Sequence, residues 1–126
     1  MAEQKRKEKA AKLRKWQKAN PELVAAQAKR NRAKLNHVKN TVKQNMQCQG
    51  KNCSAGFLLP ICLDFHHLDE KAFHIGACRH QGKLVNEINK CTVLCSNCHR
   101  LATHGYIDTK NYKRCEVDMS IFDDLR

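Results

Sequence analysis

The chain has 126 residues, with 24 Lys and Arg against 12 Asp and Glu, a formal net charge of +12, and it contains eight cysteines and seven histidines. This length accommodates one small domain plus an appendage, and a core of that size is commonly reinforced by a metal ion or by disulfides. No run approaches the ~20 apolar residues of a membrane span, and because residues 1–18 are charged rather than apolar we expect them not to be a secretory signal. We therefore expect a cytoplasmic protein with cysteines as metal ligands or buried thiols; a secreted disulfide scaffold is the alternative.

The positive charge is concentrated near the N-terminus. Residues 1–46 hold fourteen Lys and Arg and three acids, whereas residues 47–126 hold ten and nine. A basic arm of this kind suits a polyanion, because neutralising phosphates releases their condensed counterions. The pattern predicts nucleic-acid binding; a solvated charged helix and an anionic membrane surface are the alternatives.

Two helices are predicted in the arm. Residues 3–18 consist mainly of strong helix formers. The segment Asn20–Glu22 then ends one helix and starts another, because it supplies an N-cap, a proline at the first helical position and an acid at the positive end of the helix dipole. The second helix is predicted over residues 21–44. Its apolar side carries Leu35, Val38 and Val42, which indicate either a helix–helix contact or a dimer contact. The other side carries the candidate DNA-binding residues Lys29, Arg30, Arg32, Lys34, Lys39 and Lys43.

The body of the chain is predicted to mix short strands and helices. Apolar residues around Pro60 predict a short β-hairpin in residues 57–68, with its second strand at Cys62–His67. Residues 71–83 are predicted to form an irregular loop. They are followed by a short helix over Lys83–Asn89 and a brief strand over Thr92–Leu94.

A last helix is predicted from Ser96 to Thr103, ending at Gly105. The C-terminal segment is predicted to pack on the body through Ile107, Tyr112, Val117, Ile121 and Phe122.

Two pairs of cysteines have the spacing of a zinc site. Cys48 and Cys53 lie in a turn-rich segment with Gly50 between them, and Cys95 and Cys98 form a second close pair. Two such pairs can close a four-cysteine zinc site around the intervening chain, and zinc binding would supply folding energy that a small core lacks. The alternative is an iron–sulfur cluster on Cys91, Cys95 and Cys98, which normally needs a much larger barrel.

The histidines His66, His67 and His99 form a second candidate site. Adjacent residues on a strand point to opposite sides, so His66 and His67 should do different jobs. One imidazole can face a metal ion shared with His99, and the other can act as a general base near neutral pH. Ordinary hydrogen-bonded histidines are the alternative reading.

The segments Leu63–Leu68 (LDFHHL) and Cys95–Arg100 (CSNCHR), together with both cysteine pairs, resemble the HNH endonuclease family, in particular its small, phage-type, zinc-stabilised and homing-endonuclease-like members. The resemblance covers about residues 47–105. It implies an α+β fold, a small ββα-metal domain in which a β-hairpin and a helix clasp one divalent ion.

The resemblance also implies roles for individual residues. His67 matches the general base that activates water, whereas His66 and His99 match ligands of the catalytic ion, Mg²⁺ or Mn²⁺ with Zn²⁺ or Ni²⁺ as alternatives. The implied reaction is hydrolysis of a phosphodiester bond in double-stranded DNA. Asp64 and His104 are candidate accessory residues, and Arg100 is a candidate phosphate contact.

The sequence departs from the family pattern at one position. The middle Asn of the motif usually lies nine residues before the final His, and Lys90 stands there. Asn86, Asn89 and Asn97 are candidates for its role of fastening a loop.

The sequence thus predicts three parts: a basic helical DNA-binding arm (1–46), a nuclease core with a structural zinc site (47–105) and a C-terminal tail (106–126). The predicted function is that of a metal-dependent DNA endonuclease acting as a monomer or homodimer, in the cytoplasm of a bacterial host if the gene is phage-encoded. A non-catalytic zinc-bound DNA-binding module and an RNA-directed nuclease are the alternatives.

Overall fold

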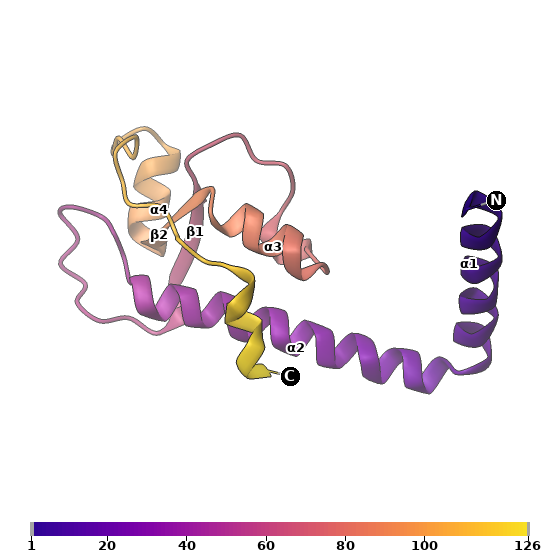
Figure 1. The fold of residues 1–126 in the computed structure, drawn as a ribbon. Coiled ribbons are helices and arrows are strands. Elements are labelled where there is room, and N and C mark those ends of the chain that lie inside the picture. The colour runs from indigo at the N-terminus through magenta and orange to yellow at the C-terminus, as the bar shows by residue number, and fades with distance from the viewer. Residues whose placement is uncertain (1, 126) are drawn as a thin grey trace. The chain divides into compact units, whose positions relative to one another are not determined.

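The structure, a computed structural model, describes residues 2–125 and has an α+β fold (Figure 1). Its helices and strands are α1 (Ala2–Ala19), α2 (Pro21–Met46), β1 (Leu63–His67), α3 (Gln81–Ile88), β2 (Cys91–Cys95) and α4 (Ser96–Thr103). Short 3₁₀ segments occupy Pro60–Cys62, Ile75–Ala77 and Met119–Leu125. The chain divides into two compact units, one ending at Ala33 and one beginning at Lys34. None of the helices in the described part is long and apolar enough to cross a membrane.

The first unit contains α1 and the first half of α2, and both predicted helices are confirmed. Asn20 separates them: its side-chain amide donates to the Trp16 carbonyl (2.8 Å), and its own carbonyl accepts from Val24 N–H (3.1 Å). No residue of α1 is buried. Helix propensity and charge, rather than apolar packing, therefore account for this unit.

The second half of α2 belongs to the second unit, because its apolar stripe is part of the core there. Leu35, Val38 and Val42 are at most 5% exposed and join a buried cluster that includes Leu63 and Phe122. The stripe that predicted either an intramolecular contact or a dimer contact is thus buried inside the chain itself.

The sheet has two antiparallel strands, and their pairing corrects the predicted hairpin. Cys62–His67 was expected to pair with the segment just before Pro60, but β1 pairs with β2, in a register that runs from Leu63 opposite Cys95 to His67 opposite Cys91. All five residues of β2 are buried, which makes it the better partner for a core strand. Pro60 lacks an N–H for a ladder and opens a 3₁₀ turn instead.

The two short helices flank β2. Helix α4 spans Ser96–Thr103 as predicted, and Gly105 follows it with a positive φ of 80°, a backbone conformation that glycine adopts without strain. Helix α3 begins at Gln81, two residues earlier than predicted, because His80 caps it: Nδ1 of this ring accepts from the backbone N–H of Lys83 (3.2 Å).

The C-terminal segment packs on the body as predicted. Tyr112 and Phe122 are buried, and the three other predicted residues pack against the core from half-buried positions: Ile107, Val117 and Ile121. Asn89 fixes the segment through its side-chain amide, which accepts from Val117 N–H (2.8 Å) and donates to Val117 C=O (2.8 Å).

Candidate functional site

The four predicted zinc cysteines come together in space. The Sγ atoms of Cys48, Cys53, Cys95 and Cys98 all lie within 4.8 Å of one another. Cys95 is the last residue of β2 and Cys98 lies in the first turn of α4, whereas Cys48 and Cys53 lie in the loop that follows α2. Among residues 2–125, this is the one group of three or more His, Cys, Asp or Glu side chains close enough to share an ion.

The geometry of the cluster fits a tetrahedral ion. A zinc ion with Zn–S bonds of ~2.3 Å holds its sulfur atoms about 3.8 Å apart. The Sγ atoms of Cys53 and Cys95 are 3.8 Å apart. Two backbone N–H groups also point at sulfur, from Gly50 to Cys48 (3.4 Å) and from Cys98 to Cys95 (3.4 Å). Such donors stabilise thiolates, which are the form that binds zinc.

The electrostatics of the cluster oppose ionisation of all four thiols together. Burial and the neighbouring thiols raise the pKa of Cys98, and burial raises the pKa of Cys48. Burial opposes ionisation of Cys95 as well, but the Cys98 N–H and the other thiols outweigh it and lower the pKa of Cys95. Four thiolates this close would repel one another strongly, so a divalent cation is what allows all four to ionise.

Gly50 and Gln47 shape the loop that carries the first cysteine pair. A Cβ atom on Gly50 would lie 2.8 Å from Cys98 Sγ, so only glycine fits here without a shift. Gln47 has a positive φ of 59°, and its side chain closes the loop by accepting from Leu58 N–H (2.7 Å) and donating to Leu58 C=O (3.0 Å).

The other four cysteines lie outside this cluster. Cys91 is fully buried, and its Sγ donates to the Glu87 carbonyl (3.4 Å). Burial raises the pKa of Cys91 and of Cys115 to about 12. Cys78 is buried too, whereas Cys62 is exposed. Because Cys91 is turned to a helix carbonyl, it does not join Cys95 and Cys98 as the iron–sulfur alternative requires.

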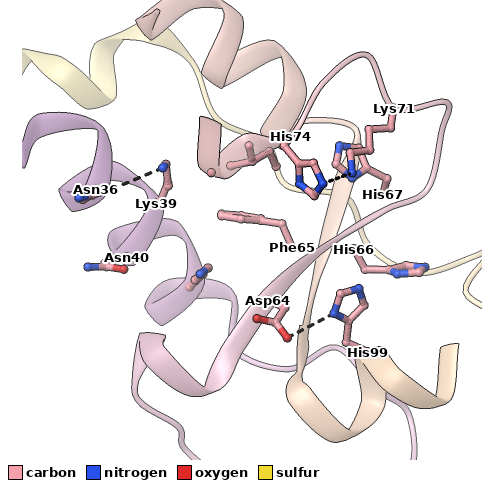
Figure 2. Close-up of a pocket in the computed structure, with 13 residues that line it drawn as sticks. Asn36, Lys39, Asn40, Asp64, Phe65, His66, His67, Lys71, His74 and His99 are labelled. Atoms are coloured by element: carbon pink, nitrogen blue, oxygen red, sulfur yellow. Dashed lines mark hydrogen bonds and ion pairs between the residues drawn. The ribbon is translucent and has the colours of Figure 1, made fainter. Parts of the chain in front are cut away.

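His66 and His99 lie beside each other, one on β1 and one on α4 (Figure 2). Their ring centroids are 5.3 Å apart, and the rings meet edge to face at 74°. Asp64 Oδ2 lies 3.2 Å from Nδ1 of His99, and Thr109 Oγ1 lies 3.3 Å from Nε2 of His66. Each ring is therefore anchored through one nitrogen, which leaves Nε2 of His99 and Nδ1 of His66 for an ion.

Two imidazoles form a small ligand set, and their nitrogen atoms suit Zn²⁺ or Ni²⁺ better than Mg²⁺ or Mn²⁺, which prefer oxygen ligands. A Mg²⁺ or Mn²⁺ ion here would need its remaining ligands from water or from a bound phosphate. The two histidines do not form a closed cage. Burial lowers the pKa of His66, and so do the nearby His99 and His67 rings, so His66 is neutral and able to act as a ligand at neutral pH.

His67 points to the other side of β1, toward α3. Its Nε2 is buried and lies 3.5 Å from Oε2 of Glu87, which is long for a hydrogen bond. Burial lowers the pKa of His67, and the charges of Lys71 and Lys90 add to this, while Glu87 works against it. A neutral His67 whose Nε2 faces Glu87 has Nδ1 as its remaining nitrogen.

Glu87 is the centre of a buried polar network that we had not predicted. Its carboxylate is 1% exposed, and Lys90 Nζ lies 2.8 Å from Oε1. Oε2 accepts from the backbone N–H groups of Ala72 (3.1 Å) and Phe73 (3.4 Å). Burial raises the pKa of Glu87, but Lys90 and these N–H groups outweigh it, so the pKa is lowered and the side chain is ionised.

This network shows how the loop after β1 is held. Three asparagines were candidates for fastening that loop in place of the middle motif residue. Asn89 holds the C-terminal segment instead, and Asn86 and Asn97 are exposed. Glu87 binds the loop backbone, and Lys90, at the departing motif position, pairs with Glu87. The sequence signal for this network is the position of Glu87. It lies three residues after Leu84, on the apolar face of α3, and three residues before Lys90.

A cleft of about 750 Å³ lies in front of the histidines. One wall comes from α2, which contributes Asn36, Lys39, Asn40 and Lys43. The other wall contains the three site histidines and Asp64, together with Lys71 and His74, whose side chains lie 3.1 Å apart (Figure 2). The cleft thus places the candidate base, the candidate ion ligands and several cations around one space.

The accessory candidates lie in a second groove of about 400 Å³. His104 and Arg100 line it together with Asp64 and His99, and both are exposed. The candidate DNA-binding residues of α2 divide between the two units. Lys29, Arg30 and Arg32 are exposed in the first unit, whereas Lys34, Lys39 and Lys43 are half-buried in the second.

No protein-family model, no curated protein and no solved structure matches the chain.

Proposed function

We propose that this chain is a metal-dependent DNA endonuclease of the HNH type, with a structural zinc ion held by its four-cysteine cluster. The observation that carries the proposal is the arrangement of His66 and His67 on β1 and His99 on α4 around one cation-lined cleft. Cys95 and Cys98 lie at the junction of β2 and α4, so an ion bound there would fix the helix that carries His99.

His67 is the proposed general base. The low pKa caused by burial keeps its ring neutral, and Glu87 occupies the side of Nε2, so Nδ1 is the nitrogen that takes a proton from water. The water oxygen forms a new bond to phosphorus, and the bond from phosphorus to the 3′ oxygen breaks. The 3′ oxygen takes up a proton, so the products carry 5′-phosphate and 3′-hydroxyl ends.

His66 and His99 are the proposed ligands of the catalytic ion, Mg²⁺ or Mn²⁺. Asp64 and Thr109 keep the two rings in place, each through the nitrogen that the ion does not need. When bound, such an ion supplies Lewis-acid stabilisation of the negative charge that builds up on the phosphoryl oxygens and on the leaving group.

The excess of positive charge supports double-stranded DNA as the substrate. The arm contributes Lys29, Arg30 and Arg32, all exposed, as phosphate contacts that orient the chain on the duplex without reading its sequence. Arg100 lines the groove next to His99, where it can contact a phosphate close to the site of cleavage.

The test is plasmid cleavage by the purified protein with Mg²⁺ or Mn²⁺. We expect nicked or linear product from the wild type, and a loss of about 10²- to 10⁴-fold in rate for His67→Ala, the range that general bases contribute. His37→Ala is the matched control, because His37 is exposed on α2 and lies outside the cleft.

Binding of the plasmid is measured in parallel for each protein. Retained binding with lost cleavage in His67→Ala assigns the residue to chemistry rather than to folding. An intact plasmid with every divalent metal tested, under conditions where the wild type binds DNA, would refute the nuclease proposal in favour of a non-catalytic zinc-bound DNA-binding module. Faster cleavage of structured RNA than of duplex DNA would show that the substrate is RNA.

A further inference from the structure

The α2 wall of the cleft is a row of cationic and amide side chains. Asn36 and Asn40 are four residues apart, as are Lys39 and Lys43, and each asparagine lies three residues before a lysine, so all four share one face of the helix. The buried residues Leu35, Val38 and Val42 occupy the neighbouring face, which anchors this part of α2 on the core. The row therefore lines the cleft on a fixed support.

The charge in the cleft is unbalanced. Lys39 and Lys43 on α2 and Lys71 on the other wall are its lysines, and Asp64 is its acidic residue. That one carboxylate is already engaged, since its Oδ2 lies 3.2 Å from Nδ1 of His99. A bound anion would thus meet several cations and one occupied carboxylate.

The two α2 lysines are positioned by packing rather than free in solvent. The ammonium of Lys43 lies 5.3 Å from the centre of the Phe65 ring, and that of Lys39 lies 3.5 Å from Oδ1 of Asn36. Burial lowers the pKa of Lys39, and the charges of Arg79 and Lys43 add to this; burial lowers the pKa of Lys43 as well. An anion in the cleft would relieve this cost of holding ammonium groups close together.

The spacing of the row suits an extended polyanion better than a single small anion. Lys39 and Lys43 are one turn apart, about 6 Å along the axis at ~1.5 Å per residue. Asn36 and Asn40 repeat the same interval with amide donors. Lysine and asparagine are among the side chains that contact sugar–phosphate backbones.

We infer that the α2 row binds the phosphodiester backbone of one nucleic-acid strand, with Lys39 and Lys43 on two of its phosphates, and leads that strand to the histidines. The inference rests on the proposed function for its choice of polyanion and adds where the strand lies. It also divides the basic residues by task. Those of the first unit attract DNA, and the two half-buried lysines hold the strand at the site of cleavage.

The experiment measures binding of a fluorescein-labelled DNA duplex by anisotropy, over ~0.05 to 0.2 M salt and without added Mg²⁺ or Mn²⁺. For the double variant Lys39→Gln/Lys43→Gln we expect weaker binding and a plot of log K against log salt whose slope is smaller by about two, since each lost phosphate contact removes about 0.9. The matched control is Lys110→Gln/Lys113→Gln, which removes the same charge from exposed positions outside the cleft.

Lys39→Arg/Lys43→Arg should keep most of the slope, because arginine also contacts phosphates. Zinc content and circular dichroism verify that each variant folds. An unchanged slope for the glutamine pair, or an equal loss in the matched control, would overturn the inference. Cleavage is scored separately, so that a wild type that binds but never cleaves refutes the nuclease function and leaves the binding result standing.

Discussion

Oε2 of Glu87 lies 3.5 Å from Nε2 of His67, and this contact connects the candidate base to the loop that follows its own strand. The same oxygen accepts hydrogen bonds from the backbone of Ala72 and Phe73. A carboxylate that holds both a ring and the adjacent loop restricts how His67 can turn. In the proposed mechanism Glu87 is thus a positioning residue, which acts on the substrate only through His67.

Replacing Glu87 should therefore affect both stability and cleavage. Glu87→Ala leaves the Lys90 ammonium and two backbone N–H groups without their partner, and we expect a loss of about 3–5 kcal/mol in the free energy of unfolding. Glu87→Gln keeps the size and one acceptor oxygen, so the loss should be about 1–3 kcal/mol. Chemical denaturation measures both values.

The cleavage assay distinguishes positioning from mere structural support. In folded Glu87→Gln protein we expect kcat to fall by at least tenfold while KM stays close to that of the wild type, because substrate contacts are untouched. Glu87→Asp keeps the carboxylate but has a shorter side chain. We expect its free energy of unfolding to lie closer to that of the wild type than its kcat does. Equal kcat values for Glu87→Gln and the wild type would show that Glu87 only supports the fold.

Much of the cysteine site was predictable from the sequence, because local spacing determines it. Cys95 and Cys98 lie two residues apart at the start of a helix whose bounds were predicted as Ser96–Thr103, and the pair Cys48 and Cys53 supplies the other half. A four-cysteine site needs only that two such pairs meet. The chain has few closely spaced pairs of cysteines, so few combinations of ligands were possible.

The strand pairing and Glu87 were not predictable in the same way. The partner of β1 is a segment more than twenty residues away, and no local pattern distinguishes it from the nearer apolar residues at 57–61. Glu87 looked like an ordinary helix acid, since its burial depends on the loop around Ala72 folding over it. Contacts of this kind depend on tertiary packing, which overrides local preference.

Zinc removal tests the structural role of the cysteine cluster. We expect one zinc ion per chain, and loss of the folded circular-dichroism spectrum when a strong chelator removes it, because metal binding supplies folding free energy here. Cys98→Ser should lose zinc, fold and cleavage together, while His99→Ala should lose cleavage alone. Cys62→Ser is the matched control, being exposed and outside the cluster. A protein that stays folded without zinc contradicts this prediction.

Gly50 provides a finer test of the same site. A methyl group on this residue would lie 2.8 Å from Cys98 Sγ, so Gly50→Ala must push the loop away from the cluster. We expect zinc affinity to fall by about tenfold or more, as for other changes beside a metal site. Gly76→Ala is the matched control, since a Cβ there has no neighbour within 4 Å. Competition with a chromophoric chelator measures both affinities, and equal values would show that the loop yields easily.

Thiol alkylation should separate seven of the eight cysteines into three groups. Cys62 is exposed and should react first with iodoacetamide. The four clustered cysteines should react only after chelation. Cys91 and Cys115 have pKa values raised to about 12, so at pH 8 only on the order of one in 10⁴ is the reactive thiolate, and both should resist until the protein unfolds. Peptide mass spectrometry follows each site; early labelling of Cys91 in folded protein would argue against its burial.

The arm can be removed at a position that the packing determines. A cut after residue 44 would delete Leu35, Val38 and Val42 from the core, whereas a cut after residue 33 leaves the second unit whole. We expect the chain from Lys34 onward to fold, bind zinc and keep Lys39 and Lys43 in the cleft. It loses eleven Lys and Arg and three acids, so its DNA affinity and the salt slope of binding should both fall. Anisotropy titrations at several salt concentrations measure this, and an unchanged slope in a zinc-loaded fragment would show that the arm does not contact phosphates.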